Sequence, residues 1–302
     1  MTACGQSAIV VIPVILILTC GCEKPAGTSK SSEEKLRQEQ QARDANERGM
    51  RASEKGDVDL AISCFSESIR LRPNHAGAYN NRGCALQEKG RLDDAIADFS
   101  EAIRIEPGDA WYYFNRGRAH VDKGDINKAI EDYTNWIRIS PSGAAYARRG
   151  DLYGQTNEPE KAIADYTEVI KLDPKVADTA YYKRALQYTL LEQWDKAITD
   201  CTEAIRLNPS GGASPYVVRG TGLSKKGDNR KAIADLTEAI RLQPDRWDSF
   251  LVRGKIYQKM GLGPEASADL AEAERLRQID QAKDGKKPAG SARKASLNSG
   301  GG

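Results

Sequence analysis

The sequence has few of the residues that catalytic and metal sites use. Its 302 residues include only two histidines, His75 and His120, and six cysteines, none of them in a CxxC motif. It also has no GxSxG, HExxH, Walker A or dinucleotide-binding motif. We therefore expect no enzymatic activity, no cofactor and no metal site. His120 is expected to be a core histidine with its ring nitrogens satisfied by hydrogen bonds.

An excess of charge of one sign is also lacking, because the formal net charge is only +2. The tail, residues 281–302, carries five basic side chains against one acidic side chain, so the rest of the chain is close to neutral and slightly acidic. A body of this charge disfavours nucleic acid as a partner. The basic tail is expected to be a disordered, solvated end, with a tether to nucleic acid or anionic lipid as the alternative.

Long hydrophobic runs are absent except at residues 8–18, an uncharged apolar stretch of eleven residues. As a helix it would reach about 16 Å, well short of a hydrocarbon core of about 30 Å. It is typical of the apolar region of a signal peptide over residues 1–22. The small residues and cysteines that follow make it similar to a bacterial lipoprotein signal, which is cut before a cysteine that becomes acylated. That resemblance implies lipidation at Cys22, which follows Gly21, with Cys20 as the alternative.

Residues 23–41 are expected to form a polar tether followed by an extension of the first folded helix. The protein would then be lipid-anchored in the cell envelope, facing the periplasm or the exterior. Ordinary secretion, or an uncleaved membrane anchor, remains an alternative. After cleavage three thiols would remain, Cys64, Cys84 and Cys201, and we interpret them as packing residues.

Instead of a catalytic motif, the chain contains a regular repeat. Small residues recur at intervals of 33 to 35 residues: Gly49, Gly83, Gly117, Gly150, Ala185, Gly220 and Gly254. An alanine follows each of them twelve positions later, from Ala61 to Ala266, and a proline closes every unit except the last. A fixed period of this size indicates stacked copies of one supersecondary unit.

Residues 76–109 show what one unit encodes. Tyr79, Gly83 and Leu86 share one face of a first predicted helix, and Phe99 lies on the inner face of a second. Pro107 ends the second helix, because its ring clashes with the preceding turn and it has no N–H to donate. The short link between the two helices requires an antiparallel pair, and the small residues allow the helices to approach closely.

This pattern resembles the tetratricopeptide repeat (TPR), with an aromatic residue at position 4, Gly at 8, Ala at 20, an aromatic residue at 24 and Pro at 32. The resemblance implies an all-α, right-handed TPR solenoid of seven helix-turn-helix repeats. The seven units are residues 42–75, 76–109, 110–142, 143–176, 178–211, 213–246 and 247–280. Stacking would let each unit bury both of its sides, since a single unit cannot offset the entropy of ordering its own residues.

Departures from the pattern cluster in the middle of the chain. Ala185 replaces the glycine of the fifth repeat, and Asn157 and Glu192 stand where other repeats have a second glycine. The connectors around the fifth repeat also change length, and residues 209–215 are predicted to be an exposed loop.

Charged residues recur as well. Arginine occupies position 7 of all seven repeats and aspartate position 23 of six. In an antiparallel hairpin these positions come close together, so we interpret them as structural ion pairs within or between repeats. The alternative is an arginine stripe that binds a polyanion.

In TPR proteins the first helix of each repeat lines a concave groove, so the resemblance implies a partner-binding surface there. The positions that would line it are Asn80, Gln87, Trp111, Phe114, Arg118, Tyr182, Lys225, Lys255, Gln258 and Lys259. Acidic residues of the early repeats, among them Asp122 and Asp151, would lie along the same surface. Aromatic side chains beside Arg and Lys are usual anchors of protein recognition.

The sequence therefore predicts a membrane-tethered TPR adaptor that binds a segment of another envelope protein. The alternatives are a self-associating structural scaffold and a small-molecule or glycan binder.

Overall fold

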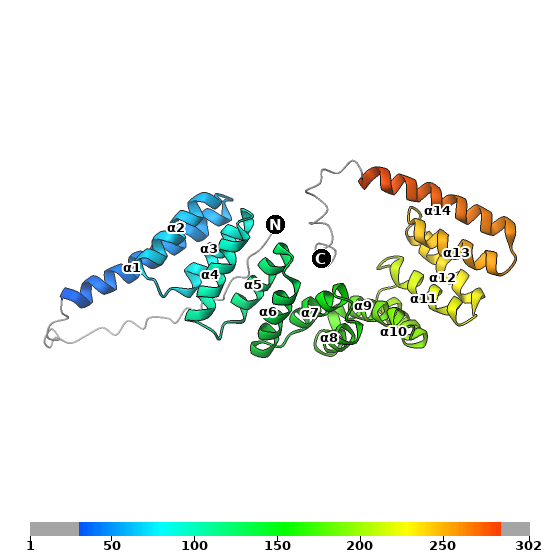
Figure 1. Ribbon diagram of the computed structural model, residues 1–302, viewed down its shortest axis with the longest axis horizontal. Coiled ribbons are helices and arrows are strands. Elements are labelled where there is room, and N and C mark those ends of the chain that lie inside the picture. Colours follow the sequence, from blue (N-terminus) through cyan, green and yellow to red (C-terminus); the bar gives the residue numbers. More distant parts are fainter. Residues whose placement is uncertain (1–29, 285–302) are drawn as a thin grey trace, which may run out of the picture. The chain divides into compact units, whose positions relative to one another are not determined.

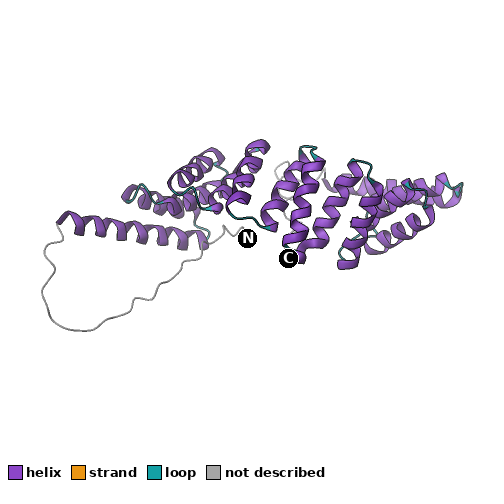
Figure 2. Ribbon diagram, turned by 90° about the horizontal axis from the view of Figure 1, so that it is seen from below, coloured by secondary structure: helices purple, strands orange, loops and turns teal. Residues whose placement is uncertain are grey.

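The computed structural model of the protein describes residues 30–284, and over that range it contains helices and turns but no strand (Figures 1 and 2). The predicted signal peptide, both candidate acylation sites and the first part of the tether lie outside the described residues, as does the tail from residue 285. Between residues 30 and 284, no helix has the length and hydrophobicity needed to cross a bilayer.

The described helices fall into two compact units, residues 30–141 and 142–284. The first unit contains α1 (Lys30–Glu54), α2 (Val58–Leu71), α3 (Ala76–Glu88), α4 (Leu92–Ile105), α5 (Ala110–Lys123) and α6 (Ile126–Ile139). The second contains α7 (Gly143–Gln155), α8 (Pro159–Leu172), the 3-10 turn η1 (Pro174–Val176), α9 (Ala177–Leu190), α10 (Trp194–Leu207), α11 (Ser214–Lys225), α12 (Asn229–Leu242), α13 (Trp247–Lys259) and α14 (Gly263–Asp284). Each expected repeat contributes one odd-numbered and one even-numbered helix, and the all-α repeat fold is confirmed.

The recurring small residue at position 8 allows the two helices of a repeat to pack closely. A Cβ atom added to Gly83 would lie 2.7 Å from Cε1 of Phe99, which is fully buried. The same clash arises between Gly49 and Phe65 and between Gly117 and Tyr133. The glycine of α3 and the aromatic ring of α4 are therefore a matched pair, as the sequence predicts.

In the fifth repeat, other residues allow the two helices to pack closely. Ala185 on α9 and Cys201 on α10 belong to one buried cluster and have no meaningful exposure. Cys201 occupies the position of Phe99, and its smaller side chain leaves room for the methyl group of Ala185. The substitution of glycine in this repeat is thus compensated across the hairpin.

The turn between the two helices of each repeat contains one residue with positive φ. Glycine provides it at Gly56, Gly90, Gly124, Gly227 and Gly261, with φ between +74° and +90°. In the fourth and fifth repeats the same conformation is adopted by Asn157, with φ of +58°, and by Glu192, with φ of +54°. The turn therefore keeps the same backbone conformation where the glycine is missing, although a residue with a side chain is strained at positive φ.

Both ends of the described chain are long helices. α1 begins at Lys30 and includes the expected extension, in which Arg37 lies 3.6 Å from Glu34 and Arg43 lies 4.0 Å from Glu39. α14 continues to Asp284, so residues 281–284, placed in the tail by the sequence analysis, are helical.

The predicted exposed loop at residues 209–215 is shorter than expected. Residues 208–211 are exposed, but Ala213 is fully buried in the core of the second unit, and α11 begins at Ser214. Pro215 therefore lies in the first turn of a helix, where its missing N–H has no intrahelical partner to lose.

Candidate functional site

The recurring Arg and Asp residues form ion pairs within six of the seven repeats, as the structural interpretation predicts. In the second repeat Arg82 donates from Nε and Nη2 to the two carboxylate oxygens of Asp98, at 2.7 and 2.8 Å. The other five pairs are Arg116–Asp132, Arg149–Asp165, Arg184–Asp200, Arg219–Asp235 and Arg253–Asp269, with shortest N–O distances of 2.7–2.8 Å. The six aspartates are only 3–8% exposed.

The third nitrogen of the guanidinium connects one repeat to the preceding one. Nη1 of Arg82 donates to Oγ of Ser66 at 3.0 Å, and Nη1 of Arg184 donates to Oγ1 of Thr167 at 2.9 Å. The hydrogen bonds that Arg82 donates to Asp98 also raise the pKa of Arg82. These arginines are therefore held by neighbouring side chains of the stack, which supports the structural interpretation over a polyanion-binding stripe.

Arg48, in the first repeat, differs from the others. Its repeat has Cys64 at position 23, and Arg48 instead contacts Glu67 at 2.6 Å, with both side chains about half exposed. The first repeat therefore lacks the buried pair of the later repeats.

An aromatic cluster in the third repeat brings two of the predicted surface residues together. Trp111 and Phe114 of α5 meet edge to face with their ring centroids 5.5 Å apart, and Phe114 lies 4.8 Å from Trp136 of α6. Tyr133 lies 5.9 Å from Trp136 and completes the cluster. Trp136 and Tyr133 are buried, whereas Trp111 is 40% exposed. The buried rings therefore support an indole that remains accessible.

Arg118 lies on the same helix, one turn after Phe114. Its guanidinium carbon is 5.7 Å from the centroid of the Phe114 ring, within cation–π range. Trp111, Phe114 and Arg118 thus lie next to one another on α5.

The other two predicted residues of the first unit are engaged in hydrogen bonds. Asn80 is only 8% exposed, and its Oδ1 accepts a hydrogen bond from Nδ2 of Asn115 at 2.8 Å. Gln87 donates from Nε2 to Asp122 at 2.6 Å. Asn80 is therefore a packing residue between α3 and α5 and not an accessible contact, because its amide is needed to satisfy a buried neighbour.

In the second unit the predicted residues lie on three helices. Tyr182 is half-buried on α9, and Lys225, at the end of α11, places its ammonium group 5.7 Å from the centroid of Trp194. Lys255, Gln258 and Lys259 are exposed and lie within two turns of α13. They form a basic strip on one helix.

Asp151, which was expected to contribute negative charge to the surface, is neutralised. Its carboxylate accepts hydrogen bonds from Nζ of Lys183 at 2.8 and 2.9 Å and from the hydroxyl of Tyr166 at 2.7 Å. The sequence pattern did not reveal this because Lys183 and Tyr166 lie on different helices, α9 and α8.

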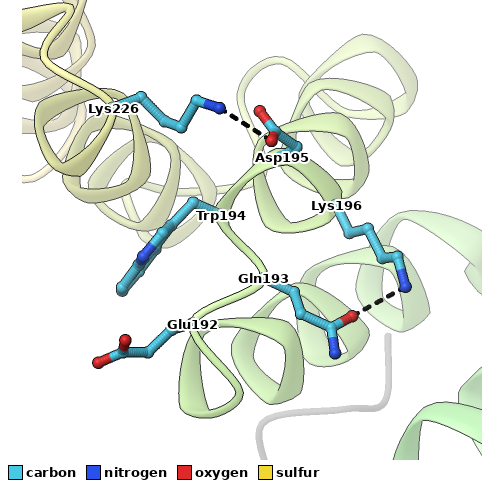
Figure 3. A pocket seen from close by; sticks show the side chains of 6 residues that line it. All are labelled: Glu192, Gln193, Trp194, Asp195, Lys196 and Lys226. Atoms are coloured by element: carbon cyan, nitrogen blue, oxygen red, sulfur yellow. Dashed lines mark hydrogen bonds and ion pairs between the residues drawn. The ribbon is translucent and has the colours of Figure 1, made fainter.

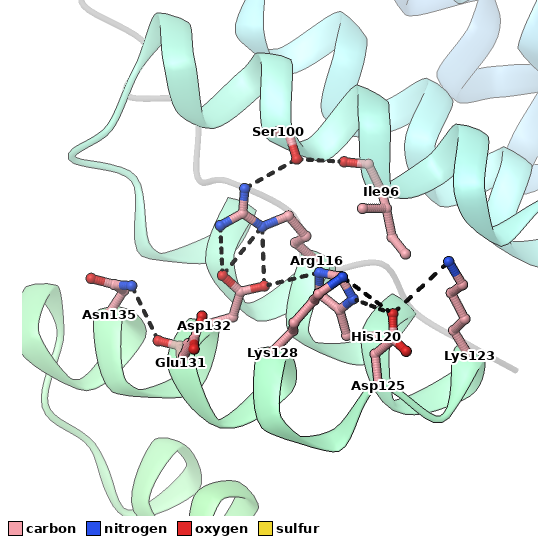
Figure 4. Close-up of polar contacts among 10 residues, drawn as sticks. All are labelled: Ile96, Ser100, Arg116, His120, Lys123, Asp125, Lys128, Glu131, Asp132 and Asn135. Atoms are coloured by element: carbon pink, nitrogen blue, oxygen red, sulfur yellow. Dashed lines mark hydrogen bonds and ion pairs between the residues drawn. The ribbon is translucent and has the colours of Figure 1, made fainter.

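His120 is buried as predicted, and Figure 4 marks its ion-pair contacts with Asp125 and Asp132, but its ring is not satisfied by hydrogen bonds. Nδ1 lies 3.6 Å from Asp125, Nε2 lies 3.9 Å from Asp132, and Nδ1 has no hydrogen-bond partner among the described residues. Burial lowers the pKa of His120, opposed by the two carboxylates. The prediction of a satisfied histidine was therefore wrong, because both carboxylates stand beyond hydrogen-bonding distance.

Cys64 and Cys201 are buried in the helical stack. Burial raises the pKa of the Cys201 thiol to about 12, so it remains protonated and a poor nucleophile at neutral pH. Within residues 30–284, no group of three or more His, Cys, Asp or Glu side chains could hold a metal ion.

One further feature was missed by the sequence analysis. A hollow of about 380 Å³ lies at the turn between α9 and α10, lined by Glu192, Gln193, Trp194, Asp195, Lys196 and Lys226 (Figure 3). The sequence did contain a signal, because the position of Trp194 is Val58, Leu92 or Ile126 in the first three repeats.

Comparisons with known proteins agree with this architecture. Profiles of the tetratricopeptide repeat match residues 76–109, 112–142, 143–176, 179–210 and 213–246, which is more than half of the 302 residues. No match was found among curated proteins.

Solved structures with similar folds include YrrB, a TPR protein with an unusual peptide-binding site, at 20% identity and a TM-score of 0.55, covering 61% of this chain and 95% of YrrB. A tetratricopeptide repeat protein from Parabacteroides merdae is 21% identical with a TM-score of 0.56, covering 78% of this chain and 93% of that one. These two similarities concern the fold alone. MamA protein is 26% identical, with a TM-score of 0.52, over 56% of this chain and 92% of MamA.

Proposed function

The chain belongs to the tetratricopeptide-repeat family, and we propose that it is a non-enzymatic adaptor that binds a segment of another envelope protein. The repeats and the structural neighbours support a role in protein–protein interaction or scaffolding. YrrB has a peptide-binding site, which makes a peptide segment a reasonable class of ligand here as well.

The observation that carries this proposal is the accessible indole of Trp111. The ring is 40% exposed although it packs edge to face against Phe114, which in turn contacts the buried Trp136. A rigid aromatic side chain beside an arginine is the usual composition of an interface hot spot. Arg118 provides that cation on the same helix, 5.7 Å from the Phe114 centroid.

A crosslinking experiment tests the adaptor proposal. The mature protein with a photo-crosslinking amino acid at Asp122, which is exposed one turn after Arg118 on α5, should capture a discrete envelope protein, and Trp111→Ala with Phe114→Ala should abolish that product. A matched control is Leu60→Ala on α2, which removes a side chain that is 51% exposed in the same unit and should leave the product unchanged. Equal capture by the wild type and the Trp111 and Phe114 double variant would contradict the proposal.

We also propose that the adaptor is tethered to a membrane through an acyl group on Cys22, so that the repeats face the periplasm or the exterior. The support is the sequence of residues 8–22, an apolar run followed by small residues and cysteine. Labelling of expressing bacteria with an alkyne-tagged palmitate should mark the wild type and Cys20→Ala but not Cys22→Ala. The reverse pattern would move the anchor to Cys20, and labelling of neither would leave a secreted protein.

The alternative is a scaffold that associates with further copies of itself through its terminal repeat. Ile279, which is 40% exposed on α14, favours it. Light scattering across a range of concentrations distinguishes the two, because an adaptor remains monomeric whereas a scaffold grows in mass with concentration.

A further inference from the structure

The hollow at residues 192–226 is built from two neighbouring repeats of the second unit. The turn after α9 contributes Glu192 and Gln193, the first turn of α10 contributes Trp194 to Lys196, and Lys226 follows α11. Figure 3 shows the indole of Trp194 and the carboxylate of Glu192 on the same side of the turn. The hollow is open, and its volume of about 380 Å³ is near the lower end for small-molecule sites.

The fold does not require the two residues that characterise this hollow. The position of Trp194 holds Val, Leu, Ile, Pro, Asn or Gly in the other six repeats, so a half-buried indole is not needed to close the hairpin. Glu192 occupies a position that five repeats give to glycine, and it adopts a φ of +54°. A strained residue next to an unusual aromatic residue indicates a function other than folding.

The lining is polar and has no net charge. Glu192 and Asp195 balance Lys196 and Lys226, and Nζ of Lys226 donates to Asp195 at 2.9 Å. Gln193 accepts a hydrogen bond from Nζ of Lys196 at 2.8 Å and retains its own amide N–H groups as donors. A highly charged ligand would find no excess of opposite charge in this lining. A purely apolar ligand would leave the polar side chains of the lining without hydrogen-bond partners.

A sugar fits this combination. Its hydroxyl groups both donate and accept hydrogen bonds, as the carboxylates, the amide and the ammonium groups of the lining require. The C–H face of a pyranose ring is apolar and weakly positive, so it packs against the electron-rich face of an indole. The ammonium group of Lys225 lies over the Trp194 ring, 5.7 Å from its centroid, where it would donate to a sugar hydroxyl.

We propose that the hollow binds a short stretch of uncharged oligosaccharide, with one pyranose ring stacked on Trp194 and a hydroxyl group held by Glu192, which lies on the same side of the turn. The hollow consists of residues of the second unit, whereas the proposed peptide surface is on α5 of the first unit, so the hollow would give the protein a second kind of ligand.

The test uses the whole mature chain and three probes, the trimer of N-acetylglucosamine, cellotriose and maltotriose. Saturation-transfer NMR should detect binding of at least one probe, and a calorimetric titration should give its dissociation constant. Trp194→Ala should weaken that affinity by about tenfold or more, and Trp194→Phe by less, because a benzene ring retains part of the stacking. If none of the three sugars binds, or if Trp194→Ala binds as the wild type does, the proposal is wrong.

Two glycine substitutions separate binding from folding. Glu192→Gly should raise the melting temperature, because it relieves the positive φ, and should weaken sugar binding, because it removes a hydroxyl acceptor. Asn157→Gly is the matched control, since it relieves the same conformation in the fourth repeat without touching the hollow. It should raise the melting temperature and leave sugar affinity unchanged. Equal sugar affinity of Glu192→Gly and the wild type would exclude Glu192 from the site and contradict the proposed arrangement.

The Trp111→Ala and Phe114→Ala double variant keeps this proposal distinct from the adaptor proposal. It should lose the crosslinked partner and retain sugar binding. If the hollow instead binds a peptide, the wild type should bind none of the sugars, and Trp194→Ala should lose the same crosslinked partner. That result would overturn the oligosaccharide assignment.

Discussion

The second and fifth repeats have the same helix-turn-helix backbone but differ at three positions of the repeat pattern. Gly83 packs against Phe99 in the second, whereas Ala185 packs against Cys201 in the fifth. The turn of the second repeat contains Gly90, and that of the fifth contains Glu192, both with positive φ. The first departure is compensated by a partner across the hairpin, and the second is not.

The turns also differ in their connection to the preceding repeat. Lys89 forms an ion pair with Asp59 of the first repeat, and Lys226 of the sixth repeat pairs with Asp195. The fifth repeat has Leu191 at this position. Its turn therefore lacks both the glycine and the lysine of the usual pattern. A departure from the repeat pattern that no neighbouring residue compensates indicates a candidate binding site. A departure that is compensated across the hairpin is only a change of packing.

The largest expected effect concerns what the two repeats have in common. Removing the arginine in Arg82→Ala or Arg184→Ala leaves Asp98 or Asp200 buried without its bidentate partner, at a cost of about 3 kcal/mol of unfolding free energy. Arg48→Ala is the control, since its pair with Glu67 is about half exposed and should contribute less than about 1 kcal/mol. Hydrogen exchange in α3, α9 and α1 measures the local loss. Equal loss in all three variants would show that the buried pairs are no stronger than the exposed one.

The next test transfers the packing of the fifth repeat into the second. Gly83→Ala should destabilise the second repeat by about 1–3 kcal/mol, because its Cβ would lie 2.7 Å from the buried ring of Phe99. The gain in helix propensity, at most about 1 kcal/mol, does not offset this. With Phe99→Cys added, the alanine should cost much less than it does in the wild type, because the second repeat would then have the Ala and Cys combination of Ala185 and Cys201. A double-mutant cycle by urea denaturation measures the coupling, and additive effects would mean that the Ala185–Cys201 match is not compensation.

The repeats, the helix pairs and the Arg–Asp pairs could be predicted from the sequence, because each of these features occurs several times in the chain. The sequence was less informative for groups that occur once. The burial of Asn80 depends on Asn115 of the next repeat, and the neutralisation of Asp151 depends on Lys183 and Tyr166, at sequence distances that no local pattern connects. The unsatisfied ring of His120 depends on distances of a few tenths of an ångström. The hollow beside Trp194 depends on the turn of one repeat meeting the end of a helix in the next.

A smaller effect is expected from exchanging the turn residues. Gly90→Glu in the second repeat should lower stability by about 1 kcal/mol, and Glu192→Gly in the fifth should raise it by a similar amount, since a side chain at positive φ is strained. Asn157→Gly should gain less than Glu192→Gly, because asparagine tolerates this conformation better than glutamate. Thermal unfolding of the three variants gives the order. A Glu192→Gly variant less stable than the wild type would mean that contacts of the Glu192 side chain outweigh the backbone strain.

The smallest expected effect is on the pH dependence of stability, and it concerns the third repeat. Position 11 is His120 in this repeat, whereas it is Leu86 in the second and Tyr188 in the fifth. Burial lowers the pKa of His120 below the ordinary value of 6.5, so the unfolded chain takes up this proton first as the pH falls. The contribution of neutral His120 to stability is therefore complete above pH 6.5 and is lost as the pH falls through the lower pKa of the folded protein. His120→Gln should remove this part of the pH dependence, a difference of less than about 1 kcal/mol between pH 7 and pH 5. His75 is present in both proteins, so the difference between their unfolding free energies isolates His120. A variant that loses as much stability as the wild type on acidification would show that Asp125 and Asp132 already stabilise the protonated ring enough to cancel the effect of burial.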